Sequence, residues 1–142
     1  MGESVGYGTQ LAIADGSGVD GVRANVTIGS GSAAVKYQAN GAGAAGNSYT
    51  VTIVDPGTSS QSFSTSLSGT DLTINLPTDG SSNLTMTASQ LVARLNTLKE
   101  FRVDAGMSAF ITNAGGAGVV QAASQTNLAS GALATHTFTS VA

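Results

Sequence analysis

Three glycines near the middle of the chain have the spacing of a dinucleotide-binding fingerprint. Gly41, Gly43 and Gly46 fit G-x-G-x-x-G, which holds a pyrophosphate when a helix begins directly after the glycines. Here the glycines lead instead into residues 49–54, YTVTIV, where large apolar residues alternate with threonines. A period of two residues is typical of a half-buried strand, which offers no helix N-terminus to a phosphate. The pattern therefore predicts a loop that enters a strand, and no nucleotide cofactor.

His136 is the single histidine of the chain and lies in the strand-like stretch LATHTFTSV. General acid–base catalysis needs a carboxylate or nucleophile beside such a residue, and a site with two histidines is impossible. None of the many serines lies in G-x-S-x-G with the strand-turn-helix context that this motif requires. We predict that the protein is not an enzyme, with no catalytic residue and no cofactor.

Five of the six aspartates are scattered singly along the chain, away from the charged residues near Asp104. Asp15 and Asp20 flank Gly16-Ser17-Gly18 and offer oxygens to calcium, but the register and the bidentate glutamate of a calcium loop are missing. The other three, Asp55, Asp71 and Asp79, lie beside Gly, Pro or Thr, where short acidic side chains stabilise turns. The sequence therefore predicts turns and no metal site.

The elements that would hold these residues are mostly short strands. Thr87 and Gln90 form a capping box, and apolar residues then recur at helical spacing, so the sequence predicts one short α-helix near residues 88–99. Alternating or short apolar runs predict strands at 24–28, 35–39, 48–54, 63–67, 72–76, 110–111, 119–120 and 134–141. The tight connection at Ser68-Gly69 predicts that 63–67 and 72–76 form a hairpin.

This order predicts a mainly β fold, an antiparallel β-sandwich that is jelly-roll-like, since only one helix is available for a crossover. Residues 1–22 are Gly-rich and are predicted to form an extended N-terminal arm, whose backbone donors need a sheet edge of the same or a neighbouring subunit. Residues 23–142 are predicted to form a single β-sandwich domain.

The composition of the chain limits the kinds of partner that it can bind. Only 9% of the 142 residues are charged, and the net charge is -3. The chain therefore lacks the excess of basic residues that is typical of nucleic-acid-binding proteins. The chain has no cysteine, no apolar run long enough to span a membrane and no signal peptide at its start. We expect no nucleic-acid or membrane partner. The low charge suits a subunit that gains stability from its neighbours, and it suits equally a small monomer with a polar, weakly charged surface.

Four motifs in this order carry a family resemblance: GAGAAGNSYTVTIVDPG at 41–57, SLSGTDLTINLPTDG at 66–80, TASQLVARLNT at 87–97 and GVVQAASQTNLASGA at 118–132. They cover about two thirds of the chain. The series resembles segments of tailed-bacteriophage virion structural proteins, among them capsid decoration (cement) proteins and tail sheath, tube or fibre components. The opening GYGTQLAIADGSG also looks like the start of some tail tube proteins.

The resemblance implies a decoration protein on the exterior of the capsid, made in the host cytoplasm and acting as a homo-oligomer, a dimer or trimer. It would bind major capsid protein subunits through sheet edges, the arm and loops, and many copies would act together. A tail tube, sheath or fibre component is the alternative. A carbohydrate-binding module is a third possibility, weakened because Trp is absent and only three tyrosines are present.

Overall fold

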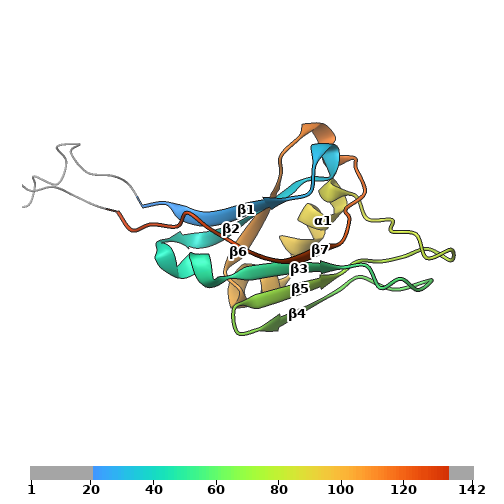
Figure 1. Ribbon diagram of the computed structural model, residues 1–142, viewed down its shortest axis with the longest axis horizontal. Helices are drawn as coiled ribbons and strands as arrows, with labels where there is room; N and C mark the ends of the chain where they lie inside the picture. Colours follow the sequence, from blue (N-terminus) through green and yellow to red (C-terminus); the bar gives the residue numbers. More distant parts are fainter. Residues whose placement is uncertain (1–20, 135–142) are drawn as a thin grey trace, which may run out of the picture.

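The computed structural model describes residues 21–134, which form two packed β-sheets and a short helix (Figure 1). The three-stranded sheet has the order β1-β2-β6, and the four-stranded sheet has the order β4-β5-β3-β7. The strands are β1 (Arg23–Ile28), β2 (Val35–Ala42), β3 (Thr50–Val54), β4 (Ser64–Ser68), β5 (Asp71–Asn75), β6 (Met107–Ile111) and β7 (Ala123–Asn127). This arrangement confirms the prediction of a mainly β, sandwich-like fold.

One strand pairing departs from the prediction of an antiparallel, jelly-roll-like sandwich. Strand β3 pairs with β5 in parallel, with Val51 opposite Leu72 and Ile53 opposite Ile74. The hairpin of β4 and β5 was predicted and is present, but it is β5, the second strand of the hairpin, that lies beside β3. The sheet is therefore mixed, because the long loop after β3 returns the chain to the same end of the sheet before the hairpin begins.

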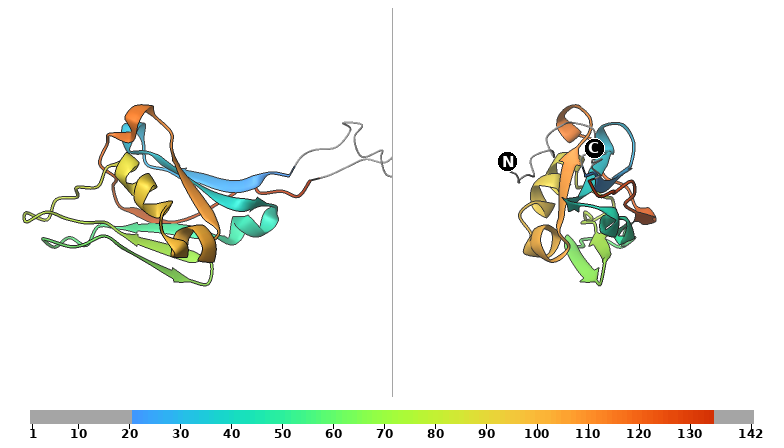
Figure 2. Two further views of the ribbon diagram at one scale, coloured as in Figure 1. Left: turned by 180° about the vertical axis from the view of Figure 1, so that it is seen from behind. Right: turned by 90° about the vertical axis from the view of Figure 1, so that its left-hand side faces the viewer.

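The core lies between the two sheets and is made of alternate residues of the strands. Tyr37, Val51, Leu72 and Ile74 are fully or almost fully buried, as the period of two residues requires. Helix α1 (Ala88–Leu95) lies beside β6 and closes one side of the sandwich (Figures 1 and 2). Its apolar stripe of Ala88, Leu91 and Leu95 is buried there.

The helix ends earlier than residue 99. Asn96 follows as the C-terminal cap, and a separate π-helical turn, η4 (Glu100–Asp104), buries Phe101. Near the end of α1 the chain turns because the Asn96 side chain bonds to the backbone of β6, a contact made across 13 residues. The sequence predicted a longer helix because the helical periodicity of apolar residues continues to Leu98. Periodicity does not show that the Asn96 side chain binds the backbone of β6.

Two strand predictions near the C-terminus have different outcomes. Val119 and Val120 do not form a strand; Val119 makes only an isolated bridge with Thr87, and the real strand is β7, made of the polar sequence ASQTN. The prediction was wrong because β7 has no apolar alternation and pairs through its backbone with β3. The strand predicted at 134–141, which contains His136, lies outside the described residues apart from Ala134.

The molecule is elongated, with different features at its two ends (Figures 1 and 2). The loops 55–63 and 76–87 project together from one end, which we call the loop end. The described chain starts and finishes at the other end, which we call the terminal end. There the backbones of Val22 and Ala132 exchange two hydrogen bonds of 2.8 and 2.9 Å. The predicted arm, residues 1–22, lies outside the described residues except for Gly21 and Val22.

The described part of the chain also contains three short 3-10 turns: η2 (Gly31–Ala33), η3 (Ala44–Ser48) and η5 (Ala114–Gly116). No helix among residues 21–134 is long and apolar enough to cross a membrane.

Candidate functional site

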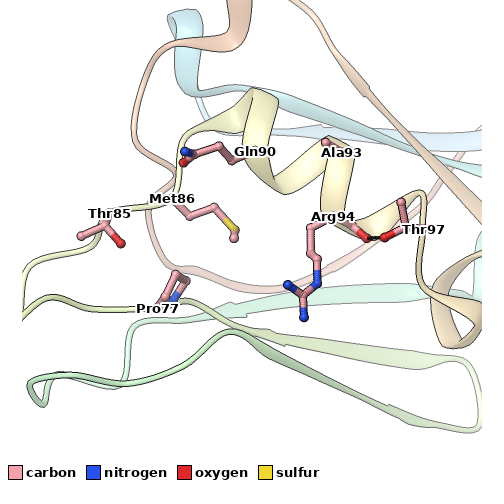
Figure 3. A pocket seen from close by; sticks show the side chains of 7 residues that line it. All are labelled: Pro77, Thr85, Met86, Gln90, Ala93, Arg94 and Thr97. Carbon is pink, nitrogen blue, oxygen red and sulfur yellow. Dashed lines mark hydrogen bonds between the residues drawn. The ribbon is translucent and has the colours of Figure 1, made fainter.

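An open groove of about 610 Å³ lies between helix α1 and the base of the projecting loops (Figure 3). Helix α1 forms one wall, and the loop that follows β5 forms the other. The lining residues are Pro77, Thr85, Met86, Gln90, Ala93, Arg94 and Thr97. The groove combines apolar surface with a single charged group, because none of these side chains except Arg94 carries a charge.

The capping box fixes the position of this helix wall. The backbone N–H of Thr87 donates to Gln90 Oε1 at 2.9 Å, and the Gln90 N–H donates to Thr87 Oγ1 at 3.3 Å. Both bonds were predicted from the spacing of the two residues. Since the apolar stripe faces the core, Gln90, Ala93 and Arg94 are left on the exposed side, where they line the groove.

Arg94 is held over an aromatic ring. Its guanidinium carbon lies 5.1 Å from the centre of the Phe63 ring, within the range of a cation–π contact. Thr97 anchors the turn behind it by donating from Oγ1 to the Arg94 carbonyl at 2.7 Å. The charged end therefore stays beside the groove, available to an anion.

Hydrogen bonds that run from loop to loop hold the projecting loops together. Ser60 N–H donates to the Asp79 carbonyl at 2.8 Å, and Thr78 N–H donates to the Gln61 carbonyl at 3.0 Å. The buried Thr78 Oγ1 donates to the Thr58 carbonyl at 2.6 Å. The two loops form one ordered unit, which we call the loop pair.

Asp79 shapes the tip of the loop pair. Its Oδ1 accepts from the backbone N–H groups of Asn83 at 2.9 Å and Ser81 at 2.7 Å. These donors lower the pKa of the fully exposed Asp79 carboxyl, because they stabilise the charged form. The carboxylate acts as a turn residue, as the sequence predicted for it.

Three edges of the sheets differ in how they are covered. Ala129 and Ala132 pair with the β1 edge at Asn25 and Val22. The β6 edge is met by Asn96, whose amide donates to the Ala109 carbonyl at 2.9 Å and accepts from its N–H at 3.1 Å. Among residues 21–134, no strand pairs with the outer side of β4, whose sequence STSLS has no charge and no proline. This edge lacks the usual protection against pairing.

Two glycines of the fingerprint, Gly43 and Gly46, have a structural role. The short 3-10 turn η3 follows Gly43, which has a φ of 126°. A Cβ on Gly46 would lie 2.8 Å from the Ala24 Cβ and 2.9 Å from the Ala39 Cβ. No α-helix begins in this segment, so the described geometry agrees with the prediction of a loop into β3.

The other candidate residues are not brought together. Asp55 accepts from the Gly57 N–H at 2.9 Å in the turn after β3, as predicted. Asp71 is instead the first residue of β5, where it accepts from Thr50 Oγ1 of β3 at 2.7 Å. Within residues 21–134, no three His, Cys, Asp or Glu side chains form a group that could hold a metal ion. Asp15 and Asp20, which flank Gly16-Ser17-Gly18, lie outside the described residues.

Tyr37 is a buried polar group without a partner. It is 0% exposed, and its hydroxyl has no hydrogen-bond partner among the described residues. Burial raises the pKa of the Tyr37 phenol, since the phenolate would be desolvated.

Sequence reasoning did not find the groove. The positions of Gln90 and Arg94 on one helix face were readable from the periodicity, whereas Pro77 and Met86 carry no signal that they face this helix.

No protein-family model, no curated protein and no solved structure gives a significant match to this chain.

Proposed function

We propose that this protein is a structural virion protein of a tailed bacteriophage, a capsid decoration (cement) protein that stabilises the head by binding across capsid subunits. The sequence resemblance described above supports the virion assignment, and the mainly β fold is compatible with it. The observation that carries the proposal is the loop pair, which extends from the sandwich and is ordered by its own hydrogen bonds.

A loop pair of this kind suits docking onto a neighbouring protein. Loops that are ordered before binding lose less conformational entropy when a partner is engaged. Within the loop pair only Asp55 and Asp79 are charged, and Gly, Ser and Thr predominate. Contact would therefore be made through hydrogen bonds and shape, at little electrostatic cost, and a regular shell would multiply a weak contact over many copies.

Imaging of purified particles at subunit resolution tests the proposal. We expect this chain on the outer face of the head, with the loop pair against capsid subunits. A chain located only in the tail would contradict the capsid assignment and support the alternative below. Adding purified protein to heads that lack it should give saturable binding and a higher temperature of head disruption.

A tail tube, sheath or fibre component is a second candidate, favoured by the difference between the two ends of the molecule. Unlike surfaces at opposite ends allow head-to-tail contacts, which generate rings or filaments. This candidate predicts that the isolated protein polymerises into rings or filaments, whereas a decoration protein stays a small oligomer until it meets the head. Electron microscopy of the purified protein separates the two.

A further inference from the structure

The groove beside α1 has the chemistry of a site for an acidic, apolar segment. Met86, Pro77 and Ala93 supply its apolar surface, and Arg94 is its one charge. None of the lining side chains is a carboxylate, so nothing within the groove neutralises the guanidinium. The Phe63 contact holds that cation in place without cancelling its charge.

The chain itself contains a segment with the complementary pattern. Residues 1–20 carry Glu3, Asp15 and Asp20 and no Lys, Arg or His. Within them, residues 9–15 read TQLAIAD. When such a segment is extended, Leu11, Ile13 and Asp15 share one face at intervals of about 6.6 Å.

The apolar and acidic side chains of that face follow one another in the same order as the apolar and basic parts of the groove. Two apolar side chains followed by a carboxylate can meet the apolar surface formed by Met86 and Pro77 and then the Arg94 guanidinium. An ion pair at the rim would set the direction of the segment, while the apolar contacts would supply most of the buried area.

The two ends of the molecule indicate which copy supplies the segment. The groove lies by the base of the loop pair, at the loop end, whereas the described chain begins at the terminal end (Figures 1 and 2). A second copy placed head to tail brings its terminal end to this groove directly. Asp15 is six residues before Gly21, so an extended connection spans at most about 20–22 Å, enough when the terminal end of the neighbour lies against this groove.

We propose that the groove between α1 and the loop pair binds residues 9–15 of a second copy of this chain. The contact is heterologous, since the groove of one copy meets the N-terminal segment of the next, and a rotation that closes after three copies gives the small oligomer expected of a decoration protein. It rests on the proposed role as an assembly subunit and names one partner for that role, a copy of the same chain.

Disulfide cross-linking tests the contact, because the chain has no cysteine of its own. Two single variants of the full chain, Ala93→Cys and Ile13→Cys, are mixed under oxidising conditions, one carrying a mass tag. We expect a disulfide-linked dimer of the tagged and untagged chains. Ser66→Cys, on the exposed face of β4, replaces Ala93→Cys as the matched control and should give only background.

A charge exchange tests the ion pair by sedimentation velocity. Arg94→Glu and Asp15→Arg should each weaken self-association by about fivefold to tenfold, and the double variant should restore it. Lys36→Glu makes the same charge change outside the groove and should leave association unaltered. Circular dichroism on each variant separates a lost contact from a lost fold.

Three outcomes would overturn the inference. The first is cross-linking no stronger than with Ser66→Cys, and the second is association insensitive to Arg94→Glu. The third is a disulfide that forms only within one chain when Ala93→Cys and Ile13→Cys are combined in the same molecule. These measurements use purified protein and are independent of the particle. If these measurements fail, imaging of the chain on the head would still support a decoration protein. If imaging places the chain in the tail, the cross-link would still support the contact between copies.

Discussion

Asn47 and Gly131, 84 residues apart, are joined by two hydrogen bonds that fasten the C-terminal segment to the turn before β3. Gly131 N–H donates to Asn47 Oδ1 at 2.8 Å, and Asn47 Nδ2 donates to the Gly131 carbonyl at 3.2 Å. Gly131 is buried, and a Cβ there would collide with the Gly43 carbonyl oxygen. The Asn47 side chain thus satisfies the N–H and the carbonyl of Gly131, as the backbone of a neighbouring strand would.

Asn47→Ala should lower the free energy of unfolding by about 1–3 kcal/mol, because it leaves a buried N–H and a buried carbonyl of Gly131 without partners. Denaturant unfolding followed by circular dichroism measures this. Asn113→Ala is the control, since it removes only an exposed bond to the Gly31 carbonyl. Equal losses in the two variants would contradict the role of Asn47.

Alanine substitutions of the fingerprint glycines test which of them is required for packing. Gly46→Ala should destabilise the fold by about 1–3 kcal/mol, because its Cβ would meet Ala24 and Ala39. Gly41→Ala should change stability by less than about 0.5 kcal/mol, since nothing lies within 4 Å of its Cβ. Thermal unfolding compares them, and equal effects would argue against a packing role.

Tyr37→Phe should leave stability near neutral pH unchanged or raise it by about 1 kcal/mol, because the lost hydroxyl is buried without a partner. In the wild type, the unfolded chain releases the Tyr37 proton above about pH 10, while the folded chain retains it. Stability therefore falls as the pH rises through that range, by up to about 1.4 kcal/mol per pH unit from this group. Urea unfolding at pH 9–11 should show a shallower fall for Tyr37→Phe. An unchanged slope would contradict this account of the buried phenol.

Asn96→Ala should expose the edge of β6 at Ala109. The variant removes both the donor and the acceptor that meet Ala109, so its amide should exchange hydrogen faster. Hydrogen exchange measured by mass spectrometry should localise the change to β6 and leave β5 protected. Uniform loss of protection would indicate general destabilisation instead.

Asp79→Ala should loosen the tip of the loop pair and leave the sandwich intact, because this exposed carboxylate accepts only from Ser81 and Asn83. Protease cleavage within the loop pair should become faster. The Asp79 pKa is lowered in the folded chain, so the stabilisation is present above the ordinary aspartate pKa and is lost as the pH falls through the folded value. Ser59→Ala, in the other loop of the loop pair, should keep wild-type cleavage and pH dependence.

Much of the fold was readable because its signals are local. Alternating residues marked β1 to β5, the two-residue connection marked the β4–β5 hairpin, and Thr87 with Gln90 marked the start of the helix. The glycine fingerprint could be dismissed for the same reason, since a strand pattern follows it directly. These features depend on neighbours within a few residues, which the sequence shows.

The remaining features depend on partners far away in the chain. The parallel pairing of β3 with β5, the end of α1 at Leu95 and the polar strand β7 follow from backbone bonds across many residues. The groove is of the same kind, because Pro77 and Arg94 come together only when the loop pair folds back beside α1. The sequence by itself determined a mainly β, weakly charged chain with one capped helix, because periodicity and turn chemistry are local properties. Only the tertiary structure decided which edges are covered and where Arg94 points, because those depend on the packing of segments that the sequence keeps apart.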